Sequence, residues 1–141
     1  MSDTQQLTDQ TAKLEDLREK VRDFQSKRGW GSESPKDIAL SMVLEVSELL
    51  EHFQFKSGKE VLEEAKLYGP ICDELADVLW WVLSMANRLD IDVTRALVQK
   101  MKKNEIKYPA EKFSSDLTDE EKRKHYYQIK AKYRGSHPLA E

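Results

Sequence analysis

Two short acidic runs, each set within an otherwise apolar segment, constrain this chain more than any other feature. They are Glu45-Val46-Ser47-Glu48 and Glu74-Leu75-Ala76-Asp77. Acids three residues apart on a helix lie on adjacent turns of one face, so each run can direct two carboxylates to a common point. Two such helices packed face to face would gather four carboxylates. Oxygen ligands of this kind suit a hard divalent cation such as Mg²⁺, or alternatively Mn²⁺, better than zinc or copper.

The apolar periodicity predicts an almost wholly helical chain. The stretch Arg28-Gly29-Trp30-Gly31 ends a first helix, and Ser34-Pro35 resembles an N-cap followed by proline at the first helical position. Gly69-Pro70 and Tyr108-Pro109 mark two further boundaries. We therefore predict helices over residues 8–27, 35–55, 70–89 and 93–107, a short amphipathic connector over residues 60–66, and a terminal helix that follows a capping box at residues 118–121 and ends near Lys132.

The second predicted helix carries its acids at the border of a broad apolar face. At 100° per residue, Glu45 adjoins this face and Glu48 lies one step further round. Leu40 and Leu44 lie beyond the acids, so that apolar residues flank the carboxylates on both sides. We therefore expect a helix that is buried on most of its surface. The apolar face consists of Ile38, Ala39, Met42, Val43, Val46, Leu49, Leu50 and Phe53.

The helix predicted over residues 70–89 repeats this arrangement. Glu74 borders its apolar face, and Asp77 lies one step beyond. Trp81 projects between these two acids in helical angle. The two acidic runs therefore occupy equivalent positions on helices that an antiparallel return could bring together.

The helix predicted over residues 93–107 bears an apolar stripe that changes into a polar one. Lys100, Asn104 and Lys107 continue the stripe that Val93 begins. A core stripe that turns into two cations and an amide faces an anionic ligand or emerges into solvent, and both alternatives stay open.

Composition limits the classes of function. The 141 residues are most simply one domain, and a net charge of −3 with a pI near 5.7 provides no electrostatic footprint for a nucleic acid polymer. A single cysteine, Cys72, excludes an intrachain disulfide. Residues 1–6 are polar and lack the apolar core of a signal peptide, and the longest apolar run, residues 78–83, is too short to cross a bilayer. We expect a soluble cytoplasmic protein without a membrane partner.

Each feature also has a simpler interpretation. Acid pairs at this spacing are common on solvated helix faces, although two pairs at matched borders of two apolar helices are harder to explain in that way. Tryptophan usually belongs to a core, but in the glycine-flanked loop around Trp30 stacking on a ligand competes with packing. His52 follows Glu48 by four residues, but the ExxH pattern of di-iron bundles needs an acid at position 49, which is Leu49.

The combined set favours hydrolysis within a polyphosphate chain. Four carboxylates would repel one another without a metal, and a bound divalent cation relieves that repulsion. A nucleoside triphosphate chelated to the metal would be neutralised further by Lys100 and Lys107, and Trp30 or Phe55 could stack on its base. The alternative is a non-catalytic helical interaction module whose acidic clusters are structural and whose terminal helix docks a partner.

The ordered series of motifs resembles the MazG-like all-α nucleoside triphosphate pyrophosphohydrolases, and within them the dCTP pyrophosphatase type. The likeness covers about Leu14 to Lys112. An ExxE motif alone is weak, but the order of the whole series is specific. The series consists of Phe24 to Trp30, Pro35-Lys36-Asp37, Glu45 to Leu49, Phe53-Gln54-Phe55-Lys56, Glu74 to Leu79, Lys100 to Asn104, and Lys107-Tyr108-Pro109.

The resemblance implies a four-helix-bundle-like fold with an additional C-terminal helix, assembled as a dimer or a dimer of dimers. It implies Mg²⁺-dependent conversion of nucleoside triphosphates, with dCTP or modified dCTP as candidates, to a monophosphate and pyrophosphate, in the manner of nucleotide pool sanitation. Residues 1–112 would form the MazG-like domain, and residues 113–141 a charged helical extension. The implied metal ligands and catalytic residues are Glu45, Glu48, Glu74 and Asp77, and the implied substrate-binding residues are Trp30, Lys36, Phe55, Trp81, Lys100, Asn104, Lys107 and Tyr108.

The sequence departs from this family at one aromatic position. Phe55 stands where the family usually has the tryptophan of an FQWK run. Phenylalanine can still stack on a base but lacks the indole N–H donor. The resemblance at this position therefore does not imply a preference for cytosine.

Overall fold

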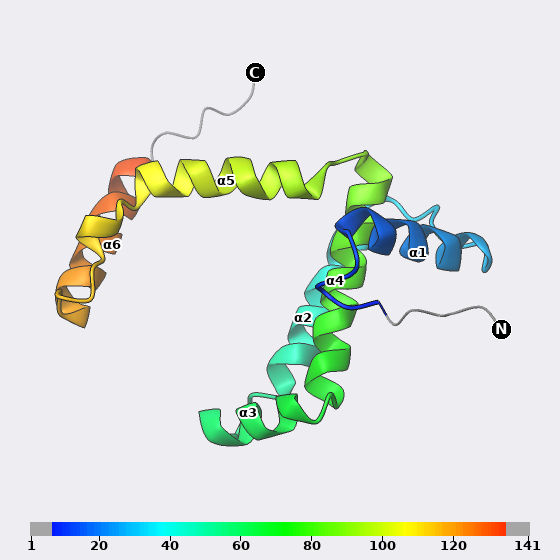
Figure 1. The fold of residues 1–141 in the computed structure, drawn as a ribbon, viewed down its shortest axis with the longest axis horizontal. Coiled ribbons are helices and arrows are strands. Elements are labelled where there is room, and N and C mark those ends of the chain that lie inside the picture. Colours follow the sequence, from blue (N-terminus) through cyan, green and yellow to red (C-terminus); the bar gives the residue numbers. More distant parts are fainter. Residues whose placement is uncertain (1–6, 135–141) are drawn as a thin grey trace. The chain divides into compact units, whose positions relative to one another are not determined.

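The computed structural model describes residues 7–134, which form helices and connecting turns (Figure 1). The predicted all-α class is confirmed for this part of the chain, which contains no strand. No helix in it is long and apolar enough to cross a membrane. The helices are α1 (Leu14–Ser26), α2 (Pro35–Glu51), α3 (Gly58–Lys66), α4 (Pro70–Leu89), α5 (Val93–Lys107), the 3₁₀ helix η1 (Ala110–Lys112) and α6 (Asp119–Tyr133).

The described chain divides into two compact units, one up to Asp92 and one from Val93 onward. The first unit therefore contains α1 to α4, and the second contains α5, η1 and α6. The domain boundary that the sequence analysis placed between residues 112 and 113 rests on composition and family resemblance. It stays a prediction. Both predicted acidic runs belong to the first unit.

Helix α4 is the central element of the first unit. Pro70 occupies its first turn, where a missing N–H costs nothing, and Asp90 ends it in the left-handed conformation. Helices α1, α2 and α3 each pack against α4, and Figure 1 shows α2 running alongside it and α1 crossing near its C-terminal half. The most deeply buried apolar residues come from α1, α2 and α4, and they are Val21, Ile38, Ile71, Leu83 and Ala86.

A polar seam joins α1 to α4 beside this core. Arg18 Nε donates to Asn87 Oδ1 at 3.1 Å, and Asn87 Nδ2 donates to the Arg18 carbonyl at 3.0 Å. Further along, Gln25 Nε2 donates to Ser84 Oγ at 3.0 Å. Gln25 and Ser84 are 7% and 3% exposed, so their hydrogen bond removes the cost of burying a hydroxyl and an amide.

The first helix begins later than predicted, because a local turn competes with it. The Thr8 N–H donates to Thr11 Oγ1 at 2.9 Å, and side-chain bonds of this kind draw the backbone away from helix. The helix starts after Lys13, whose extended backbone N–H donates to Asp16 Oδ2 at 2.7 Å. The predicted span from residue 8 is therefore wrong at its N-terminal end.

The second helix ends earlier than predicted. It stops at Glu51, and residues 52–55 form turns. Ser57 caps the next helix, α3, through a reciprocal bond with Glu60, so the intervening residues must reverse the chain. Phe55 takes a φ of 60°, which is uncommon for a residue other than glycine, and its side chain is fully exposed.

The prediction that α2 is buried on most of its surface is wrong for the single chain. Helix α4 covers the side of α2 that carries Ile38 and Glu45. One neighbouring helix cannot cover the whole circumference, so Val43, Leu44 and Leu50 are each about 60% exposed. Helix α2 therefore presents a broad exposed apolar face, which consists of Leu40, Val43, Leu44, Val46, Leu50 and Phe53.

In the second unit, aromatic contacts hold α6 against the end of α5. Tyr108 stacks on Tyr126 with ring centroids 6.0 Å apart, and it meets Phe113 edge to face at 5.9 Å. Lys107 Nζ lies 5.2 Å from the Tyr108 ring centroid and 5.0 Å from that of Tyr133. The predicted C-terminal helix is confirmed, together with its capping box between Thr118 and Glu121.

We expect Thr118→Ala to loosen the first turn of α6. The backbone and hydroxyl groups of Thr118 both donate to the Glu121 carboxylate and hold its pKa below the usual value. A group with a depressed folded-state pKa stabilises above its unfolded-state pKa, and its contribution disappears as pH falls through the folded-state value. The amide hydrogens of Glu121 and Lys122, which bond to Thr118, should exchange about fivefold faster at pH 7.

This difference in amide exchange should shrink as the pH is lowered through the Glu121 pKa. Ser115→Ala, at an exposed position before the cap, serves as the matched control. Equal exchange rates in the wild type and Thr118→Ala at neutral pH would show that the capping box does not stabilise the first turn of α6.

Candidate metal centre and adjoining pocket

Three carboxylates meet between α2 and α4. One oxygen from each of Glu45, Glu48 and Glu74 lies within 4.8 Å of the others. Glu45 and Glu48 come from adjacent turns of α2, and Glu74 comes from the facing turn of α4, as the matched borders of the two helices predicted. Glu45 and Glu74 are partly buried, whereas Glu48 is exposed.

The charges in this cluster oppose one another. The pKa of Glu48 is raised, chiefly by the negative charge of Glu45 and next by that of Glu74. The pKa of Asp77 is also raised, first by partial desolvation of its carboxylate and then by the charge of Glu45. Asp77 is not one of the three residues in the tight cluster, but it shares the electrostatic field of Glu45. The negative charges of these carboxylates are therefore not fully offset by neighbouring positive charge.

Two polar side chains flank the cluster. Trp81 Nε1 donates to Glu45 Oε1 at 3.1 Å, so this tryptophan orients a carboxylate rather than filling the core alone. His52 Nε2 lies 3.9 Å from Glu74 Oε1. Position 49 is a leucine, so the ExxH pattern of di-iron sites remains disfavoured. The contact between His52 and Glu74 comes instead from the turn that ends α2. The sequence spacing alone did not reveal this placement of His52.

An aromatic pocket, here called the acid-side pocket, adjoins the carboxylates. Its volume is about 300 Å³, in the range of small-molecule sites. The Phe24 ring meets Trp80 edge to face with centroids 5.0 Å apart, and it lies tilted against Trp30 with centroids 6.1 Å apart. Trp30 remains 57% exposed, so part of its indole is available to a ligand. The lining residues are Phe24, Gln25, Trp30, Glu33, Glu45, Asp77, Trp80 and Trp81.

Two other predicted site residues of the first unit do not line this pocket. Phe55 does not line it and projects into solvent. Lys36 is exposed in the first turn of α2. Four further predicted contacts belong to the second unit, and their role at the carboxylates stays a prediction. These four are Lys100, Asn104, Lys107 and Tyr108.

The residues present fit a hard divalent cation. The tight cluster offers only carboxylate oxygens, without the cysteine thiolates or multiple imidazoles that zinc prefers. Mutual repulsion raises the pKa of Glu48, which is the cost that a bound cation would remove. Glu45, Glu48 and Glu74 can therefore supply the first ligands, with Asp77 nearby.

We predict that Glu45→Gln lowers the pKa of both Glu48 and Asp77 in metal-free protein. The larger decrease is expected at Glu48, because the charge of Glu45 is the main cause of its raised pKa. Carbon-13 NMR of the carboxyl groups, titrated with EDTA present, measures both values. Glu63→Gln, on α3 and paired with Lys66, provides the control. Unchanged titration of Glu48 would contradict the proximity of these carboxylates.

Comparison with known proteins gives a consistent family. The model of the MazG-like family matches residues 40–120. Proteins named dCTP pyrophosphatase 1 from Rattus norvegicus and Homo sapiens are 37% and 34% identical to this chain over 100 and 101 residues, which are 68% and 69% of it. The matched part spans 59% of the length of each of these relatives.

A solved structure is also similar to this chain. A pyrophosphatase from Archaeoglobus fulgidus superposes with a TM-score of 0.62 at 36% sequence identity. The match covers 74% of this chain and 99% of the archaeal protein.

Proposed function

The chain belongs to the MazG-like family, and we propose on that basis that it hydrolyses nucleoside triphosphates to a nucleoside monophosphate and pyrophosphate. The observation that carries the proposal is the cluster of Glu45, Glu48 and Glu74 beside an aromatic pocket. Carboxylate oxygens can coordinate the metal of a chelated nucleotide, and aromatic rings can stack on its base.

We assign the cation to Glu45, Glu48, Glu74 and Asp77, with Mg²⁺ as the preferred ion and Mn²⁺ as a substitute. When bound, such an ion lowers the pKa of a coordinated water and stabilises negative charge on phosphate oxygens. The protein's part is to hold these acids in place, and the Trp81 N–H fixes the orientation of Glu45. Phe24, Trp30 and Trp80 form the aromatic side of the acid-side pocket, which Glu45 and Asp77 also line.

The base is expected to bind in the acid-side pocket, where Trp30 provides an exposed aromatic surface. The mammalian relatives carry the name dCTP pyrophosphatase 1, so dCTP and modified dCTP are the first substrates to test. We further propose that Lys100, Asn104 and Lys107 contact phosphate or sugar, together with Tyr108. Removal of damaged nucleotides from the pool is the biological role that fits this reaction.

We predict that Glu48→Gln or Asp77→Asn abolishes release of pyrophosphate. Loss of partners that only support metal ligands costs about 10–100-fold, so loss of a ligand should cost at least about 100-fold. Both variants should stay folded, and in EDTA they should be as stable as the wild type or more so, because a repelling charge has been removed.

A panel of ribo- and deoxynucleoside triphosphates with Mg²⁺, scored for pyrophosphate, measures this activity and reports base and sugar preference. Glu63→Gln is the matched carboxylate control, because Glu63 lies outside the cluster. Full activity in Glu48→Gln would show that the Glu48 carboxylate is not needed for hydrolysis. Silence of the folded wild type across the whole panel would favour the non-catalytic interaction module.

We also propose that the chain acts as a dimer or a dimer of dimers. The exposed apolar face of α2 lies on the helix that carries Glu45 and Glu48, and an apolar face of this kind is commonly covered by a second subunit. Covering it with a second copy would place the active site close to the interface.

The expected outcome is an oligomer in sedimentation velocity that dissociates, with loss of activity, in the double variant Val43→Lys with Leu50→Lys. Both side chains are about 60% exposed, so lysine should be tolerated within one chain. Lys59→Ala, on α3, is the control for altered surface charge. A folded and fully active wild-type monomer would overturn the proposed assembly.

A further inference from the structure

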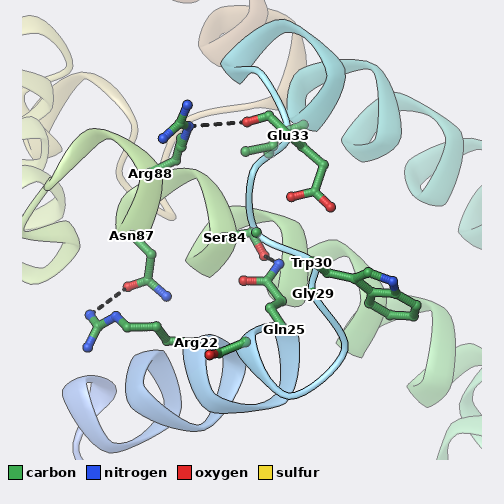
Figure 2. Close-up of a pocket in the computed structure, with 11 residues that line it drawn as sticks. Arg22, Gln25, Gly29, Trp30, Glu33, Ser84, Asn87 and Arg88 are labelled. Carbon is green, nitrogen blue, oxygen red and sulfur yellow. Dashed lines mark hydrogen bonds between the residues drawn. The ribbon is translucent and has the colours of Figure 1, made fainter.

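A second cavity lies on the other side of the loop that carries Trp30, and it is here called the arginine-side cavity (Figure 2). Its volume is about 390 Å³. It shares Gln25, Trp30 and Glu33 with the acid-side pocket but contains none of the clustered carboxylates. Its remaining lining residues are Arg22, Ser26, Gly29, Gly31, Ile38, Ser84, Asn87 and Arg88.

The amide of Gln25 provides an oriented acceptor in this cavity. Ser84 Oγ donates its only proton to the Trp80 carbonyl at 2.9 Å, so toward Gln25 it can only accept. The Gln25 amide must therefore present its Nε2 to Ser84, at 3.0 Å, and its oxygen away from Ser84. Within residues 7–134 that oxygen accepts no hydrogen bond from the protein, and since no fully buried side-chain oxygen or nitrogen there lacks a partner, it is reached by solvent although the residue as a whole is only 7% exposed. Water can satisfy this acceptor in the free protein, and a ligand that enters the cavity with an N–H donor can replace that water.

Two arginines supply positive charge to the same cavity. Figure 2 shows Arg88, Asn87 and Arg22 in succession along one side, with Gln25 and Ser84 at the centre. Arg88 Nε donates to the Glu33 carbonyl at 3.2 Å, and no carboxylate in the described part of the chain pairs with it. Arg22 Nη2 donates to Asn87 Oδ1 at 3.2 Å, and it also lies 4.0 Å from Glu15 Oε1 in an exposed ion pair. Each guanidinium keeps further N–H groups for an anion.

We propose that the arginine-side cavity is a second ligand site, which binds a nucleoside 5′-monophosphate whose base bears an amino group. The phosphate would bind the guanidinium groups of Arg88 and Arg22, and the amino group would donate to the unpaired Gln25 oxygen. The cavity volume falls within the usual range for a small-molecule site. The choice of a nucleotide among phosphate monoesters rests on the proposed function, because that reaction releases a monophosphate.

This site differs from the acid-side pocket in its electrostatics. The acid-side pocket repels a phosphate unless a divalent cation is bound, since Glu45 and Asp77 line it. The arginine-side cavity is lined by two arginines, Arg22 and Arg88, and by one carboxylate, Glu33, so a phosphate can bind there without a metal. Binding that persists in EDTA therefore distinguishes the two sites. Because Trp30 lines both, its fluorescence reports occupancy of either.

The test is titration of the full chain with dCMP in EDTA, followed by calorimetry and tryptophan fluorescence. We expect metal-independent binding that Arg88→Ala weakens about tenfold, while Arg123→Ala, an exposed arginine on α6, leaves it unchanged. Glu45→Gln should also leave it unchanged. Absence of dCMP binding in EDTA, or binding that Glu45→Gln strengthens and Arg88→Ala does not weaken, would overturn the proposal.

Comparison of dCMP with dUMP tests the role of Gln25. The carbonyl of uracil replaces the amino group and would face the Gln25 oxygen, so dUMP should bind about tenfold more weakly. Gln25→Met keeps the side-chain length and should bring the two affinities together. Ser84→Ala is a second route, because it frees the amide to rotate. If both folded variants still bind dCMP more tightly than dUMP, Gln25 does not recognise the base.

The two proposals fail separately. A chain that releases pyrophosphate from triphosphates with Mg²⁺, but does not bind dCMP in EDTA, retains the proposed function and loses the second site. A chain that binds dCMP in EDTA in an Arg88-dependent manner, but is silent on the nucleotide panel, retains the second site and loses the proposed function.

Discussion

Repulsion between carboxylates on α2 and α4 is the constraint on which the rest of the first unit depends. Glu45, Glu48 and Glu74 are held within 4.8 Å because α2 packs along α4, and that packing must oppose their mutual repulsion. Apolar contacts on the central helix and the hydrogen bond from Trp81 provide the opposing interactions. The proposed cation site is thus built at the expense of the stability of the metal-free protein, as is common for functional sites.

The sequence predicted the part of this site that depends on helical geometry. The spacing of Glu45 with Glu48, and of Glu74 with Asp77, placed the acids at the borders of two helices, and three of the four form the tight cluster. The angle of Trp81 placed it between the acids, where its N–H contacts Glu45. Helix ends signalled by Gly, Pro and capping residues agreed well for α4, α5 and α6. These features depend on local spacing, which a single sequence displays directly.

Features that depend on tertiary competition could not be predicted in the same way. The apolar arc of α2 looked like a core face, but α4 covers only one side of it, and burial requires a neighbour that periodicity does not identify. His52 reaches Glu74 only because the chain turns after Glu51. The amide of Gln25 gave no signal in the sequence, since its importance arises from Ser84, far along the chain.

The loop between α1 and α2 ties the two cavities to each other through Gly31. Its φ is +95°, and a Cβ at this position would lie 3.6 Å from Gln25 Cβ and 3.7 Å from the amide oxygen. The left-handed backbone there is strained for any residue with a side chain. A Cβ at Gly31 would make only ordinary van der Waals contact with Gln25, so the cost of a substitution lies in the backbone next to Trp30; Trp30 and Gln25 line both cavities. A change in the path of this loop would therefore alter the proposed base pocket and the proposed second site together, so the two could not diverge independently through it.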